Sequence, residues 1–481
     1  MTRTSIKKNF LMNIVLTMSS FLFPLITFPY VTRVLLAEGT GRVAFATSII
    51  SYFSLFAQLG IPTYGIRACA QVRDNKKELT RTVHELVIIS LITTTISYIV
   101  LLLTIAMIPR FQEEKRLLLI ISTGIILSVF GVEWLYKGLE LYSYITIRSI
   151  IFKFIALIAM FLMVRTKDDY LQYGFITVLA ANASNILNLV NANKYIGFRP
   201  LERYDLKRHW RPVVIFFAMA CASTIYTHLD VVMLGFMKTN TDVGYYNAAV
   251  KIKTVLVSIV TSLGAVVLPR ASYYVENDQM EEFWRICKKA LTFVILLATP
   301  LTIYFIMFAR DGVLFLSGDA FESSVVPMQI IMPTLILIGI TNILGIQILV
   351  PTGREKIVLY SEVAGAVTDV IINAALIPRM ASTGAAIGTL VAEAVVLVVQ
   401  YYYLRNEINE MVKGIHWGRI LFATLMALVL ASWVKQLEVG HFITLALSSM
   451  LFFGIYGLFL LLRKEELVVE ILKQVLSRIK R

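Results

Sequence analysis

Long apolar segments separated by short polar connections run along the whole chain. Most reach the ~20 residues that an α-helix needs to cross ~30 Å of hydrocarbon, so the pattern predicts about 14 transmembrane helices. Strands of a membrane barrel would be about ten residues long with strict alternation, so the predicted fold is all-α. The segments are residues 10–34, 43–66, 86–108, 117–135, 146–164, 170–192, 213–237, 244–268, 290–309, 325–350, 357–378, 384–404, 417–434 and 441–462.

Composition and charge agree with an integral membrane protein. Hydrophobic residues make up 58% of the chain, charged residues 16%, and the mean hydropathy is +0.75, which excludes an ordinary soluble globule. The net charge is +14, and most Lys and Arg lie at helix ends on the side that both termini share. By the positive-inside rule that side is cytoplasmic. The basic residues therefore indicate topology and contact with anionic membrane lipids, not nucleic-acid binding.

The second half of the chain is a loose copy of the first. Gly41–Arg67 aligns with Gly244–Arg270, and Lys137–Glu140 aligns with Thr352–Glu355 in the same order. Two echoes in order predict a duplicated helical bundle, which secondary transporters use to place a substrate site between two halves. Each half has an even number of helices, so the repeat is parallel.

The repeat and the basic connection at residues 193–212 define the predicted domains. An N-terminal six-helix bundle is followed by a C-terminal six-helix bundle, two extra helices and a basic amphipathic cytoplasmic tail. The tail has apolar residues at helical spacing, so it either lies on the inner leaflet or packs as a cytoplasmic segment. The four ranges are 1–200, 201–404, 405–462 and 463–481.

Three lysines fall well inside predicted helices, where a charge at mid-bilayer costs about 2.5–3.5 kcal/mol on insertion scales. They are Lys153, Lys251 and Lys253. Such residues must face protein or water, and Lys251 and Lys253 lie about 200° apart around a helix, so at most one faces a cavity squarely. They are candidates for binding an anionic headgroup. The alternative is an internal ion pair with Asp230.

Three arginines at helix ends are further candidates. Arg33 flanks the first outer turn, while Arg67 and Arg270 end two helices at equivalent repeat positions. Arginines at such ends commonly anchor the helix by reaching the headgroups. Their repeat equivalence also allows Arg67 and Arg270 to flank the inner mouth of a central cavity, where planar guanidinium groups would hold a diphosphate.

Three acidic residues are candidates for ion coupling: Asp230, with the weaker candidates Glu133 and Asp369. A buried carboxylate exchanges a proton when burial and a nearby lysine push its pKa in opposite directions, and the alternative is a structural salt bridge. Pro24 and Pro29 each remove a backbone hydrogen bond from the first helix and predict a bend, which is either a static kink or a hinge.

Nothing in the sequence predicts a cofactor or an enzyme. The connections between helices are short, the longest being about 20 residues, which leaves no extramembrane domain to hold a donor and an acceptor. No His or Cys pair has metal-ligand spacing. A proton or sodium gradient is the candidate energy source, and the sequence does not choose between them.

Several motifs carry a family resemblance. The chain resembles the Wzx-type polysaccharide flippases of the multidrug/oligosaccharidyl-lipid/polysaccharide exporter superfamily over nearly its whole length. The motifs are Glu133-Trp134-Leu135-Tyr136-Lys137-Gly138 with Glu140 and Tyr142, Gly244-Tyr245-Tyr246-Asn247, Leu268-Pro269-Arg270, Pro351-Thr352-Gly353-Arg354-Glu355, and Asn373 to Pro378.

The resemblance implies a transporter that moves undecaprenyl-diphosphate-linked oligosaccharide repeat units across the bacterial cytoplasmic membrane for capsule, O-antigen or exopolysaccharide assembly. It implies a MATE-like architecture with alternating access around a cationic cavity, and a polysaccharide polymerase and glycosyltransferases as partners. The drug-exporting branch commonly has an acidic residue in its first helix, and residues 10–34 contain none. A lipid II flippase is the closest alternative. A membrane-embedded polymerase or acyltransferase and a passive scaffold are the others.

Overall fold

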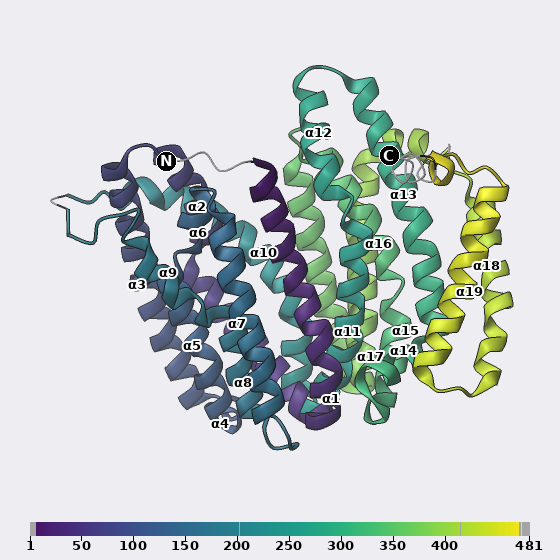
Figure 1. Ribbon diagram of the computed structural model, residues 1–481, viewed down its shortest axis with the longest axis horizontal. Helices are drawn as coiled ribbons and strands as arrows, with labels where there is room; N and C mark the ends of the chain where they lie inside the picture. The colour runs from purple at the N-terminus through teal and green to yellow at the C-terminus, as the bar shows by residue number, and fades with distance from the viewer. Residues whose placement is uncertain (1–5, 202, 414, 471–472, 474–481) are drawn as a thin grey trace. The chain divides into compact units, whose positions relative to one another are not determined.

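The protein consists of helices and their connections in the residues that its computed structural model describes, which are 6–201, 203–413, 415–470 and 473, with no strand among them (Figure 1). The fold separates into two units, Met1–Gly244 and Tyr245–Arg481. The predicted division into repeat bundles at residue 200 stays a prediction. Most of the predicted amphipathic tail lies outside the described residues.

The first unit is built around α1 (Ile6–Gln58), which packs against α3, α5, α7, α8 and α10. This long helix is broken at Leu36, where φ is 58° and ψ is −171°, so it consists of two arms. The other elements are α2 (Ile61–Val72), α3 (Lys76–Met107), α4 (Pro109–Glu113), α5 (Lys115–Gly131), α6 (Glu133–Gly138), α7 (Tyr142–Met163), α8 (Tyr170–Val178), a π-helix η1 (Leu179–Ala183), α9 (Asn185–Ala192) and α10 (Lys207–Met237).

The second unit contains a comparable broken helix, α17 (Glu355–Val412), whose backbone leaves the helical region at Ala381. It packs against α15, α16 and η3, and α18 packs against α19. The remaining elements are α11 (Asn240–Thr261), which begins in the first unit, α12 (Gly264–Glu276), α13 (Met280–Met307), α14 (Ala309–Ser317), η2 (Asp319–Ser324), α15 (Val325–Ile331), α16 (Thr334–Asn342), the π-helix η3 (Ile343–Leu349), α18 (Trp417–Ser432), η4 (Trp433–Leu437) and α19 (His441–Leu462).

Helix length and composition confirm the all-α membrane fold. In the described chain, 10 helical segments are long and apolar enough to cross a bilayer, or up to 12 if each of two bent pairs is one span. Two of them, Leu11–Val72 and Glu355–Val412, have 62 and 58 residues, so each is long enough to cross twice. This arrangement accommodates the predicted crossings. On α3, Ile92, Ile96 and Ile99 form an exposed apolar stripe that suits contact with lipid tails.

The Glu-Trp-Leu-Tyr motif lies in the core of the first unit. Trp134, Leu135 and Tyr136 of α6 are buried, and the Tyr136 hydroxyl donates to the Asn188 carbonyl oxygen at 2.6 Å. A Cβ on Gly65 would lie 2.7 Å from the Trp134 ring, so this position needs glycine for α2 and α6 to approach. The motif therefore stabilises the packing of α6 on α2.

Candidate functional site

The ammonium group of Lys153, on α7, contacts the first arm of α1. Its Nζ donates to Ser19 Oγ at 2.8 Å and to Ser20 Oγ at 2.9 Å. Both partners are neutral hydroxyls, so they solvate the ammonium without cancelling its charge. Lys153 is half-buried and faces protein, as a charge inside a predicted span must.

A buried arginine lies one and a half turns before Lys153 on the same helix. The guanidinium of Arg148 donates to Ser184 Oγ at 2.8 Å and Asn185 Oδ1 at 3.1 Å, and it pairs with Glu133 Oε2 at 3.3 Å. Arg148 is 4% exposed. Sequence reasoning missed it because it lies near the start of its apolar segment, where an arginine resembles an end anchor. Glu133 is thus engaged in an ion pair.

The carboxylate of Asp230 is buried on α10, and other residues of the same helix line a small polar pocket. The pocket has a volume of about 320 Å³ and lies between the second arm of α1, the start of α2 and the middle of α10. Its polar wall consists of Ser51, Ser54, Gln58, Thr63, Thr224 and His228. The His228 ring nitrogen Nδ1 lies 3.2 Å from Ser48 Oγ. This pocket could not be predicted from the sequence, because its hydroxyl residues are spread along apolar segments.

The remaining predicted cations differ in exposure. Arg67 on α2, Lys251 on α11 and Arg270 on α12 are exposed, while Lys253 is half-buried. No hydrogen bond or ion pair holds the first three to another side chain within the described part of the protein. Arg33 is exposed as well, and its NH1 donates to the Pro29 carbonyl oxygen at 2.7 Å.

The two predicted hinge prolines both lie within the first arm of α1. The Pro29 carbonyl accepts from the Arg33 guanidinium, and the Thr27 hydroxyl donates to the Pro24 carbonyl at 3.4 Å. The pronounced break in α1 is at Leu36 and not at either proline. Whether the prolines act as a hinge stays a prediction.

In the second unit, Asp369 lies between the two arms of α17. Asp369 and Asn373 are one turn apart and are buried, and both approach Gly388 on the other arm. A Cβ on Gly388 would lie 2.1 Å from Asn373 Oδ1 and 3.0 Å from Asp369 Oδ1, so the missing side chain makes room for both. Beside it, the hydroxyls of Tyr246 and Thr389 are 2.8 Å apart. This group offers oxygen atoms of the kind that bind hard cations.

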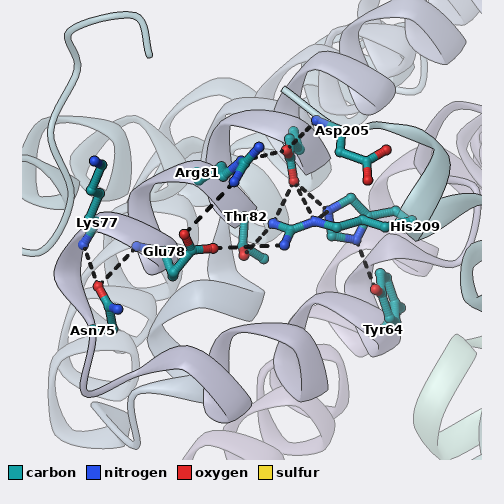
Figure 2. Close-up of polar contacts among 10 residues, drawn as sticks. Tyr64, Asn75, Lys77, Glu78, Arg81, Thr82, Asp205 and His209 are labelled. Atoms are coloured by element: carbon teal, nitrogen blue, oxygen red, sulfur yellow. Dashed lines mark hydrogen bonds and ion pairs between the residues drawn. The ribbon is translucent and has the colours of Figure 1, made fainter. Parts of the chain in front are cut away.

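A dense ionic network in the N-terminal third of α3 holds the connection between α9 and α10. Glu85 is fully buried, and its Oε1 accepts from the Asp205 backbone N–H at 2.6 Å. Its Oε2 accepts from Arg208 Nε at 2.8 Å and lies 2.8 Å from His209 Nε2, while Arg81 Nε lies 3.3 Å from Oε1. Figure 2 shows Arg81, Asp205 and His209 converging from separate segments, with Tyr64 bonded to the other nitrogen of His209.

Another buried carboxylate, Glu114, lies between α4 and α5, beyond the C-terminal end of α3. Its Oε1 accepts from Asn240 Nδ2 at 3.0 Å and pairs with Arg42 at 3.4 Å. Burial raises the pKa of Glu114 above its ordinary value, and the charges of Arg42 and Arg110 with the Asn240 hydrogen bond offset this only in part. Glu114 therefore links Arg42, which follows the break in α1, to Asn240, the first residue of α11.

The predicted residues divide between the two units. Lys251, Lys253, Arg270 and Asp369 lie in the second unit, and Arg33, Arg67, Lys153, Asp230, Glu133, Pro24 and Pro29 lie in the first. Among the described contacts, the structure brings Glu133 to Arg148 and Lys153 to the two serines of α1. The residues that were not foreseen are Arg148, Glu85, Glu114 and the hydroxyl pocket.

The sequence matches one protein family and several relatives. Residues 6–275 match the model of a family described as "Polysaccharide biosynthesis protein". A candidate O-antigen transporter of Escherichia coli K12 is 24% identical over 407 residues, which cover 84% of this chain and 98% of the relative.

Solved structures show the same fold at low identity. The lipid II flippase MurJ in an inward closed conformation has a TM-score of 0.63 at 14% identity, covering 93% of this chain and 99% of that one. An inward-facing multidrug resistance MATE transporter of the MOP superfamily has a TM-score of 0.62 at 13% identity, covering 82% and 95%. These two likenesses establish a MATE-like membrane fold.

Proposed function

The chain belongs to the polysaccharide biosynthesis protein family, and from this premise we propose that it flips a lipid-linked oligosaccharide across the bacterial cytoplasmic membrane. The cargo is an undecaprenyl-diphosphate-linked repeat unit for capsule, O-antigen or exopolysaccharide, and transport proceeds by alternating access. The resemblance to Wzx-type flippases is confirmed. Both termini lie in the cytoplasm in this proposal.

The observation that carries the proposal is a pair of exposed cations, Lys251 and Arg270, that have no hydrogen-bond or ion-pair partner in the described chain. Lys251 lies within Asn240–Thr261, a helix long and apolar enough to cross a membrane, where its charge is costly unless water or an anion compensates it. Arg270 lies on the following helix, α12. A diphosphate supplies that compensation, and the guanidinium of Arg270 matches two phosphate oxygens at once.

For coupling, Asp369 is better placed than Glu133. The side chain of Glu133 is 39% exposed, whereas Asp369 is buried beside Asn373. A buried carboxylate can exchange a proton, and carboxylate and amide oxygens are ligands that suit a sodium ion. Asp230, also buried, remains the second candidate in the first unit.

Two alternatives make different predictions. A lipid II flippase would use the same cationic residues for the same diphosphate, and the structural likeness to MurJ at 14% identity concerns the fold alone. A membrane-embedded enzyme would form or break sugar bonds, but the full-length relative is named as a transporter.

The test uses purified protein in liposomes and a fluorescent undecaprenyl-diphosphate oligosaccharide. Wild-type protein should move the lipid between leaflets without changing its sugar chain. In cells, Lys251→Ala and Arg270→Ala should each abolish surface polysaccharide while the protein stays in the membrane.

Arg285→Ala is the matched control for these two variants. Arg285, like Lys251 and Arg270, is an exposed cation of the second unit. Its charge is already paired with Glu282 of its own helix, so export should continue in the variant. Wild-type export by both Lys251→Ala and Arg270→Ala would remove these residues from the site. Formation of sugar bonds in the liposomes would instead identify an enzyme.

A further inference from the structure

The hydroxyl-lined pocket of the first unit differs from the proposed cationic site, because its wall is polar but carries no Lys, Arg, Asp or Glu. Its ten lining residues lie between Ser51 and Thr63 and between Ala220 and His228. A diphosphate carries charge that such a wall would not neutralise. The wall therefore suits a neutral polar group better than a charged one.

Lipid tails do not fit this pocket either. Ser51, Ser54 and Gln58 lie within a helical segment long and apolar enough to span a membrane, where polar groups facing hydrocarbon are costly. The Gln58 amide donates to Ser54 Oγ at 2.7 Å, which leaves the Ser54 proton available to another acceptor and the Gln58 carbonyl available to another donor. These groups need water or a hydroxylated ligand.

The backbone builds the pocket in two ways. The helix α10 bends by 46° between Lys207–Cys221 and Thr224–Met237, and Ala220 and Thr224 lie on the two sides of this bend. At Gly60, φ is +72° and a Cβ would lie 2.4 Å from the Phe217 backbone nitrogen, so only glycine lets α10 approach the end of α1 here. The bend in α10 and the close approach at Gly60 thus shape the wall of the pocket.

Aromatic side chains contact two residues that line the pocket. The Phe217 backbone lies against Gly60, and the Phe217 ring centroid lies 5.4 Å from that of Phe56. Tyr52 packs edge-on to His228, with centroids 6.4 Å apart. A pyranose ring presents hydroxyls at its edge and an apolar C–H face, so a hydroxyl wall with aromatic neighbours suits both of its surfaces.

We propose that this pocket binds one neutral sugar residue of the lipid-linked oligosaccharide, separately from the cations that hold the diphosphate. The volume of about 320 Å³ is at the small end of ligand pockets, about 300–1,000 Å³, so it takes part of an oligosaccharide and not the whole. Sugar hydroxyls both donate and accept, as do Ser54, Thr224 and Gln58. This inference rests on the proposed flippase function.

The test compares two lipids, undecaprenyl diphosphate carrying the oligosaccharide and undecaprenyl diphosphate without sugar. Thr224→Val and Gln58→Leu keep side-chain size while removing hydrogen bonds. Each should slow movement of the sugar-bearing lipid at least about fivefold and leave the sugar-free lipid unchanged. Thr123→Val is the control, because Thr123 is an exposed hydroxyl on α5 that donates to its own helix, and it should change neither rate.

A binding measurement separates this inference from the proposed function. In a variant whose native cysteines are replaced, Thr224→Cys is labelled with a water-soluble maleimide, and the sugar-bearing lipid should protect it while the sugar-free lipid should not. Equal effects of the two lipids, or no effect of either variant on transport, would overturn the pocket assignment. Protection without any transport by the wild type would keep the pocket and refute the flippase.

Discussion

Replacing Glu85 by alanine should destabilise the first unit more than any exposed charge substitution near it. The carboxylate is fully buried and accepts from the Asp205 backbone, Arg208 and His209, with Arg81 in ion-pair distance. Its removal leaves these donors without their common acceptor.

The structure sets the size of the effect. Breaking a buried ionic network by removing one partner costs about 3–5 kcal/mol. The side chains of Arg81 and Arg208 are 31% and 34% exposed, so water reaches them after the change. We therefore expect about 3 kcal/mol, which for a unit of this size lowers the melting temperature by about 6–12 °C.

Glu78→Ala is the matched control, since it removes a carboxylate of the same helix. Glu78 is 37% exposed and lies 3.8 Å from both Arg81 and Arg208, so its loss should cost about 0–1 kcal/mol. The assay is thermal unfolding in detergent, followed by size-exclusion of the folded fraction. Equal melting temperatures for the two variants would refute the idea that Glu85 is the centre of the network.

Two further predictions concern the contact of α1 with the start of α11. Because burial raises the pKa of Glu114, the folded protein holds this proton more tightly than the unfolded chain, so stability falls as pH rises from the ordinary carboxyl value of about 4.3 through the raised one. Glu114→Gln should flatten this fall in thermal melts, and parallel wild-type and variant curves would contradict it. Gly41→Ala should cost about 1–3 kcal/mol, because its Cβ would lie 1.7 Å from the Asn240 carbonyl oxygen. Gly454→Ala, with nothing within 4 Å of its Cβ, should be neutral or slightly stabilising in the same melts, and equal losses would exclude the close approach.

The helical spans could be predicted from the sequence, but their breaks could not. Residues 10–34 and 43–66 are separate apolar segments, yet α1 runs through both and breaks at Leu36. The same holds for α17 at Ala381. Neither residue is a glycine or proline, and each adopts a positive φ that only the surrounding tertiary structure can enforce.

The repeat echoes were visible in the sequence because some of them mark sites of close backbone approach. A Cβ on Gly41 would lie 2.8 Å from the Gly244 backbone nitrogen, so the two glycines aligned by the repeat contact each other. In the second aligned pair of segments, the two glycines have different roles. Gly138 packs on Cys69, whereas Gly353 adopts φ +71° in a turn with open space around it. Sequence alone shows that glycine recurs and not why.

Two of the motifs that carry the family resemblance, Glu133 to Gly138 and Pro351 to Glu355, contain residues that stabilise the fold within the described chain. Trp134 and Tyr136 are buried in the core, and Arg354 pairs with Glu407 at 3.2 Å. The ionic contacts of the first unit were hidden for another reason. Glu85 and Arg208 are 123 residues apart in sequence, and only the fold brings them together.

Cations that pair with a carboxylate and cations that lack such a partner should have different roles. Arg148 and Arg208 each contact a carboxylate, so their charge is compensated inside the protein and their loss should reduce stability. Lys251 and Arg270 are exposed without such a partner in the described chain, so their loss should cost little stability and remove an attraction for an anion. Net positive charge alone cannot distinguish these two groups. The proposed diphosphate site therefore depends on the second group, and an Arg270→Ala variant that melts like wild type but does not transport is the phenotype that separates them.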